Sequence, residues 1–410
     1  MSVLSKSVLL SSVSLCVVGV FNAAQAADSL EAAFKEGKAT FETRYRYEFA
    51  DQANIANDAH AQTLSTRLGY KTGELHGFSL LVEGENITQV GPDNYNDTIN
   101  NRTDHPTIAD VEDTAVNQAY LSYAGIPDTN LKVGRQIIAL DNQRFIGPGK
   151  WRQNDQTFDA ATLFNSSLQD TTLTYNYITG VNRIFGTNSP VGDFDSNSHA
   201  VTLTNSSLPI GKVSAYAYLL DFQSSSPANS SDTYGISLVG KQKLNAATTF
   251  KYRAEYAQQS DAGDNANNYN ADYFHLKPAL AWNGWTATLG YESLGSDNGA
   301  SFRTPLATLH KFNGWADIFL TTPATGLEDL YADITYKFGG EGALSGLSLK
   351  GQYHDFSAES GGADYGTEFG LSAYKPIAEK YFVHARYADY DADTFAADTQ
   401  RFIFGAGFKF

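Results

Sequence analysis

Strict alternation of apolar and charged side chains in KATFETRYRYEFA, residues 38–50, limits what this chain can fold into. One set of alternate positions holds Phe41, Thr43, Tyr45, Tyr47 and Phe49, and the other holds Glu42, Arg44, Arg46 and Glu48. Alternate positions share one face of an extended strand, whereas a helix would mix the two sets. The segment therefore predicts a β-strand with one apolar face and one charged face.

The same alternation returns along the chain, for example in residues 62–72 and 247–258, where Arg67 and Arg253 lie on the charged faces. An arginine at the middle of a bilayer costs roughly 2 to 4 kcal/mol, so these faces must meet water. Segments of this kind, from residues 38–50 to residues 400–410, predict about 18 strands. The predicted fold is all-β, a transmembrane antiparallel β-barrel with a charged lumen.

The N-terminus resembles a secretory leader. Lys6 precedes an apolar run, and Ala24-Gln25-Ala26 has the small residues of a cleavage site. We therefore expect a signal peptide over residues 1–26 and a single barrel domain over residues 27–410. The one cysteine, Cys16, falls inside the leader, so the mature chain can form no disulfide or thiolate metal site.

Charge and composition exclude several classes of protein. Without Lys6, 28 basic residues face 45 acidic ones, a net charge of −17, which excludes nucleic acid as an expected partner. No segment after the leader has the roughly 18 apolar residues that a spanning helix needs. An aromatic share of 13% fits the girdles of a membrane barrel.

The connections between predicted strands alternate in length. Short ones such as residues 283–284 interleave with long ones at 89–112, 141–155, 181–196 and 295–327. Bacterial outer-membrane barrels have short periplasmic turns and long outer loops, so this rhythm places the chain in the outer membrane of a Gram-negative cell, among membrane lipid and lipopolysaccharide. Phe410 ends an aromatic strand that should pair with residues 38–50, and it resembles the signal read by the outer-membrane assembly machinery.

Residues 131–163 concentrate charge around a glycine-broken loop. The cations are Arg135, Arg144, Lys150 and Arg152, and the acids are Asp141, Asp155 and Asp159. One interpretation is a selectivity cluster in the lumen, with Arg144 and Arg152 as carboxylate contacts. The alternative is a loop braced by its own ion pairs. Strict alternation points Arg135 at lipid, so we expect either a bulge or a position near the outer interface.

The connection 295–327 is long enough to fold over or into the pore. His310, Trp315 and Asp317 could line a sugar path, or Trp315 and Phe312 could hold the loop against the wall. The acidic connection 89–112 lacks the spacing of a compact calcium loop, so we predict a solvated outer surface there and no metal site.

Two blocks of sequence resemble a known family. The runs GRQ, LDNQRFIG and WRQNDQTFDA, at residues 134–160, and FRTPLATLHKFNGWADIF, at residues 302–319, are similar to signatures of the alginate export family of outer-membrane barrels. The resemblance implies an 18-stranded monomeric barrel that passes a uronate polysaccharide. Acids offset the lumenal cations in this chain, so we expect passive passage of a hydrophilic, anionic or carbohydrate-like solute, or else a nonspecific or uptake porin.

No motif predicts an enzyme. The chain contains neither H-E-x-x-H nor G-x-S-x-G, and its eight histidines are scattered. A barrel hydrolase would need Ser, His and acidic residues that meet only in space. We therefore expect no catalytic residue and no cofactor.

Overall fold

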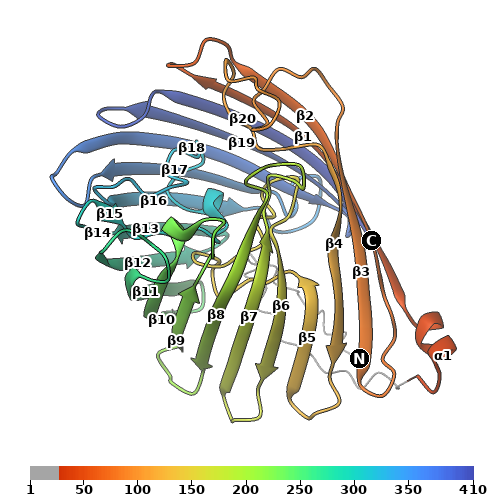
Figure 1. Ribbon diagram of the computed structural model, residues 1–410. Helices are drawn as coiled ribbons and strands as arrows, with labels where there is room; N and C mark the ends of the chain where they lie inside the picture. Colours follow the sequence, from red (N-terminus) through yellow and green to blue (C-terminus); the bar gives the residue numbers. More distant parts are fainter. Residues whose placement is uncertain (1–26) are drawn as a thin grey trace.

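Eighteen antiparallel strands close into one barrel in the computed structural model, which describes residues 27–410 (Figure 1). Each strand pairs with its neighbours along the chain, and β20 (Thr399–Lys409) pairs back onto β1 (Lys38–Gln52), so the sheet closes on itself. The other wall strands are β2 (Ala59–Lys71), β3 (Phe78–Gln89), β4 (Asp113–Tyr123), β5 (Thr129–Gln136), β6 (Thr157–Asn165), β7 (Thr171–Asn182), β8 (Asp193–Asn205), β9 (Lys212–Leu220), β10 (Ser231–Lys243), β11 (Thr248–Asp261), β12 (Asn270–Trp282), β13 (Trp285–Leu294), β16 (Leu327–Lys337), β17 (Ser348–Ser357), β18 (Asp364–Ile377) and β19 (Tyr381–Ala392).

The predicted 18-stranded antiparallel barrel is confirmed. Within residues 27–410, helix is confined to α1 (Leu30–Lys35), which lies outside the wall, and to two 3-10 turns, η1 (Pro227–Asn229) and η2 (Leu309–Lys311). A small hairpin, β14 (Ser296–Asp297) with β15 (Ala300–Ser301), belongs to a loop. The predicted signal peptide lies outside the described residues.

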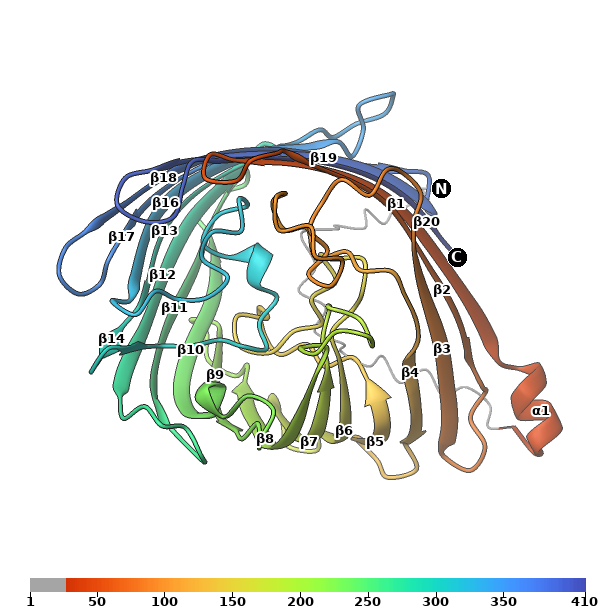
Figure 2. The ribbon, with the colours of Figure 1, turned by 45° about the horizontal axis from the view of Figure 1, so that its top comes forward.

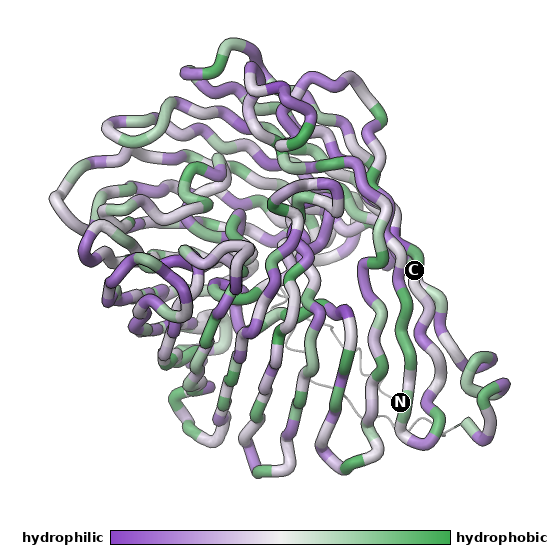
Figure 3. The backbone as a smooth tube through the Cα atoms, viewed as in Figure 1, coloured by the Kyte–Doolittle hydropathy of each residue, from purple (hydrophilic) through white to green (hydrophobic). Residues whose placement is uncertain are grey.

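The outer face of the wall is apolar. Outward-facing Leu289, Leu330 and Tyr353 are each at least half exposed, while their sequence neighbours face inward. Figure 3 shows the resulting alternation of hydrophobic and hydrophilic residues along the strands. Aromatic rings gather toward the strand ends, as where Trp285 packs on Tyr336 at 4.5 Å. Such a surface is stable against hydrocarbon and unfavourable in water. Between residues 27 and 410 no helix has the length and apolar character to cross a membrane.

The two ends of the barrel differ in their connections. Tight turns join strands at one end, as at Asn283-Gly284, where both residues have the positive φ angles that a two-residue hairpin requires. The long connections 90–112, 137–156 and 295–326 all lie at the other end of the barrel. Each of them follows a strand that runs away from the end with the tight turns. This confirms the predicted rhythm of short turns and long outer loops.

These three long connections fold back into the barrel instead of standing above it (Figure 2). The main hydrophobic cluster therefore lies in the lumen, where Phe145 and Phe302 from the loops pack against the wall residues Tyr216 and Tyr273. The prediction of a solvated surface for 89–112 is wrong at Asp110, which is completely buried. Its carboxylate lies within the lumen because the loop bends inward to reach cations of the wall.

Candidate functional site

The loops 137–156 and 295–326, which we call the lumenal loop pair, are joined by backbone hydrogen bonds. Ile146 and Leu306 form a parallel bridge, and the amide of Gly147 donates to the carbonyl of Leu306 at 2.8 Å. Gln156 donates through Nε2 to the carbonyls of both Gly147 and Leu306. The two loops therefore form one structure across the lumen, although they are about 150 residues apart in the sequence.

The loop 90–112 supports this pair from the side. Asp110 Oδ1 accepts from the amide of Gln153 at 3.1 Å, and Asn154 Nδ2 donates to the carbonyl of Val111 at 3.1 Å. Gln153 also reaches the wall, where its Nε2 donates to Thr63 on β2. Three segments far apart in the sequence thus converge on residues 153–154.

Arg144 and Arg152 are buried and ion-paired. Arg144 Nε lies 2.8 Å from Glu292, and Arg152 reaches Glu48 at 3.0 Å and Asp317 at 2.8 Å. Burial alone would lower the pKa of Arg152, but the two carboxylates raise it above its ordinary value. Of the two interpretations of residues 131–163, these contacts favour bracing of the loops for both arginines.

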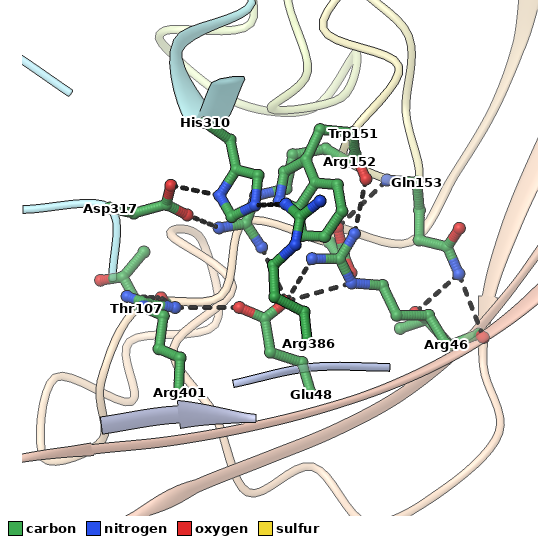
Figure 4. Close-up of polar contacts among 12 residues, drawn as sticks. Arg46, Glu48, Thr107, Trp151, Arg152, Gln153, His310, Asp317, Arg386 and Arg401 are labelled. Carbon is green, nitrogen blue, oxygen red and sulfur yellow. Dashed lines mark hydrogen bonds and ion pairs between the residues drawn. The ribbon is translucent and has the colours of Figure 1, made fainter. Parts of the chain in front are cut away.

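Glu48, on β1, is the centre of the largest ionic cluster (Figure 4). Its carboxylate accepts from Arg46 at 2.6 Å, from Arg152 at 3.0 Å and from Arg401 at 2.9 Å. Arg401 also donates to the carbonyl of Ala316 in the loop 295–326. A buried carboxylate that holds three guanidinium groups fixes the loops to the wall by charge as well as by packing.

His310 has a defined tautomer because of its two neighbours. Nδ1 lies 2.6 Å from Asp317 Oδ1, so it donates, while Nε2 faces Nη1 of Arg386 and must accept. The ring stacks on Trp151 with centroids 3.7 Å apart. Burial first, and the nearby arginines after it, lower the pKa of His310 to about 3. Burial opposes ionisation of Asp317, but His310 and Arg152 keep its pKa below its usual range.

Three more of the predicted cations, Arg67, Arg253 and Lys150, also lie within ion-pair distance of carboxylates. Arg67 contacts Glu42, Glu85 and Asp155, and Arg253 contacts Asp141 and Glu255. Lys150 is exposed, with its ammonium group 3.7 Å from Asp155.

Arg135 holds Asp159 through two hydrogen bonds of 2.9 and 3.0 Å on the outer face of the wall. The β5–β6 register has no bulge at this point, so Arg135 does point outward as strict alternation requires.

Trp315 and Arg46 form a further feature of the lumen together with three residues that were not predicted from the sequence, Trp151, Lys350 and Arg386. The guanidinium of Arg386 on β19 lies between the rings of Trp151 and Trp315, 4.2 Å from each centroid. Arg46 also lies over the ring of Trp151, at 4.5 Å, and Lys350 lies over Trp315 at 5.2 Å. We call these five residues the cation–indole column. Alternation along residues 380–389 already places Arg386 on the inward face, but nothing in the sequence places it beside the two indoles.

Among the arginines on the wall strands of the described chain, two have no carboxylate within ion-pair distance, Arg44 on β1 and Arg386 on β19. Arg44 donates only to the side chain of Gln153 and to the carbonyls of Lys150 and Arg152. Arg386 contacts only His310 and the two indoles. Both side chains are half-buried, and Nε of Arg386 and Nε1 of Trp151 lack acceptors among residues 27–410. Within the same residues, no cluster of His, Asp and Glu is arranged to hold a metal ion.

Comparison with known proteins agrees with this architecture. The solved structures of Acinetobacter baumannii OccAB2 and Pseudomonas aeruginosa OpdL share 18% and 17% sequence identity with the chain, with TM-scores of 0.74 and 0.71. Each match covers 92% of this chain, and 98% and 99% of those chains. A structure of P. aeruginosa OpdK with vanillate matches at 13% identity and a TM-score of 0.71, over 92% of this chain and 99% of that one.

Identities this low establish the fold alone. A search of curated protein sequences finds no significant match. The profile of the family described as alginate export matches residues 37–294, which is more than half of the chain. The chain therefore belongs to the alginate export family and is a β-barrel porin of the Gram-negative outer membrane.

Proposed function

We propose that the protein passes a hydrophilic, anionic or carbohydrate-like solute across the outer membrane passively, without a chemical step. The observation that carries this proposal is the pair Arg44 and Arg386, whose charges are not offset by a neighbouring carboxylate. The buried acids of the lumen are paired with arginines that hold the loops. The charges of Arg44 and Arg386 therefore remain available to a passing solute.

The cation–indole column supports the same proposal. Arg386 Nε and Trp151 Nε1 are donors without acceptors, and they lie on neighbouring side chains. The half-buried guanidinium of Arg386 has no carboxylate partner of its own, and it could bind a carboxylate of the solute by charge and hydrogen bonds. The lumenal loop pair narrows the path, which favours selection over free diffusion.

Ion preference in a planar bilayer tests the proposal. Arg44→Glu with Arg386→Glu should move the reversal potential in a salt gradient from the anion side toward the cation side. Lys35→Glu reverses a single charge on α1 outside the barrel, and it should leave the reversal potential unchanged. Uronates, neutral oligosaccharides and simple anions, added as competitors, would identify the solute class. An unchanged reversal potential in the double variant would refute the role of these arginines.

We also propose that the protein is a monomer and that the assembly machinery recognises its last strand. Phe402 and Phe404 of this strand point away from the lumen, and they are exposed, as is Phe410 directly after the strand. The surrounding partners are membrane lipid and lipopolysaccharide, because the wall lies in the outer membrane.

A further inference from the structure

The barrel wall is interrupted above the end of β5. The strand β4 pairs with β5 only from Ala119 to Tyr123, so residues 113–118 have no partner on that side. The cause is the inward turn of the chain after Gln136, which returns to the wall only at Thr157. Figure 1 shows β5 ending well below its neighbours. At this height the next strands along the wall are β6 and β7.

A polar cavity of about 340 Å³ fills the interruption. Asn117 and Asp155 line its inner end and are buried beneath the lumenal loops, whereas Val116 and Asp193 line its outer end and are exposed. At ~30 Å³ per molecule, the cavity has room for roughly eleven waters. The cavity therefore extends from buried residues beneath the lumenal loops to exposed residues of the outer face.

Specific contacts frame this cavity. Arg135 and Asp159 form its lower edge, and Arg135 also donates to the carbonyl of Val116 at 3.3 Å. At the upper edge, Thr187 donates through its amide and its hydroxyl to the carboxylate of Asp113, at 3.0 and 2.7 Å. These contacts hold the two sides of the opening in place.

The opening lies at the level of the polar headgroups. Val133, Ala161, Tyr177 and His199 form one outward-facing row across four strands, and Tyr177 stacks on His199 at 5.1 Å. Arg135 and Asp159 are the next outward pair above that row. Aromatic rings mark the boundary of the hydrocarbon, so water is available immediately above them.

The lining is strongly acidic. It contains Glu85, Asp113, Asp155, Asp159, Asp193 and Asp195 against only Arg135 and Arg183. Arg67 and Arg135 neutralise part of this charge, but no described cation lies within ion-pair distance of Asp113, Asp193 or Asp195. The Nδ2 of Asn182, in the same lining, is buried without an acceptor, which indicates water or a polar solute at that position.

We propose that this opening is a water-filled side entrance from the outer-leaflet interface into the lumen, and that it favours small hydrated cations. This proposal goes beyond the proposed function, because it describes a second route into the barrel. The lining of this route is acidic, whereas the path beside Arg44 and Arg386 is cationic. A single lumen would then receive anions along β1 and β19 and cations between β4 and β7.

Thiol labelling of the mature chain in proteoliposomes tests water access, because the mature sequence has no cysteine of its own. In the variant Asn182→Cys, a cationic methanethiosulfonate should react roughly tenfold faster than an anionic one of similar size. Leu121→Cys, on the lipid-facing side of β4, should react with neither. Absence of reaction at position 182, or equal rates for the two reagents, would overturn the proposal.

A bulky side chain placed in the opening tests whether ions pass through it. Ala115→Trp, in the cavity lining, should lower the total conductance and shift the ion preference toward anions, whereas Leu121→Trp should change neither. Wild-type conductance and preference in a folded Ala115→Trp barrel would overturn the side entrance. If Ala115→Trp shifts the ion preference but Arg44→Glu with Arg386→Glu does not, only the proposed function is refuted. If Ala115→Trp does not fold, the labelling rates at position 182 decide.

Discussion

Acidification should release the loop 295–326 from the lumen wall through His310. In the docked loop, Nδ1 of His310 donates to Asp317, and Nε2 faces the guanidinium of Arg386. A proton on Nε2 of His310 would point one N–H donor at the N–H donor of Arg386. It would also add a positive charge beside Arg386 and Arg152. Docking therefore requires a neutral imidazole, whereas a released loop would expose the ring to water.

The size of the effect follows from the two pKa values. A solvated histidine titrates near 6.5, and the docked His310 has a pKa of about 3. Docking is thus fully stable above about pH 7 and weakens as the pH falls from 6.5 toward 3, since only the released state takes up the proton. At pH 4.5 the loss is about 2.7 kcal/mol, or about 100-fold in the ratio of docked to released loop.

Single-channel recording at pH 7 and pH 4.5 measures this release as new conductance levels or gating noise. His310→Gln is the matched control, because its amide can donate to Asp317 and accept from Arg386 but cannot take up a proton. The wild-type protein should lose docked occupancy in acid, and the variant should not. The reasoning fails if both proteins respond equally to acid, or if the wild type does not respond down to pH 4.5.

Three further predictions concern stability and assembly. Arg144→Ala leaves Glu292 buried without its cation, so it should loosen the lumenal loop pair by about 3 to 5 kcal/mol and speed proteolysis within 295–326, with partial rescue by Arg144→Lys. Gly290→Ala places a Cβ where the ring of Tyr331 lies, and it should cost about 1 to 3 kcal/mol, measured as an earlier heat-induced mobility shift of the barrel on gels. Deletion of Phe410 should reduce the amount of protein assembled in the outer membrane while the assembled channels keep normal conductance. Normal accumulation would remove Phe410 from the assembly signal.

Most of the wall could be predicted from the sequence, because every strand must present one face to hydrocarbon and the other face to water. The exception is β5, which ends at Gln136 although the apolar sequence continues beyond it. Its apolar continuation, Ile137 to Leu140, looks like more strand in the sequence. Ile138 instead packs inside the lumen, where the loop residues form a core of their own.

The candidate site was less predictable, because its partners come from segments far apart in the chain. In the sequence, Asp110 belongs to an acidic connection that we expected to be solvated. In the barrel Asp110 is buried, because its loop reaches Arg46 and Gln153. Alternation places both Arg46 and Arg386 on the inward face of the wall. Arg46 meets Glu48 two residues along the same strand, whereas the contacts of Arg386 depend on how the loops fold across the lumen, which local sequence does not encode.

The mixed charge of the lumen therefore has a different meaning in the structure than in the sequence. Counting residues suggests a path in which acids cancel arginines. In the barrel, Glu48, Asp110, Glu292 and Asp317 are all buried, and each is engaged by an arginine that ties a loop to the wall or to another loop. A passing solute meets only charges that no such contact has neutralised. Selectivity should therefore depend on the few unpaired arginines, and hardly on the net charge of the lumen.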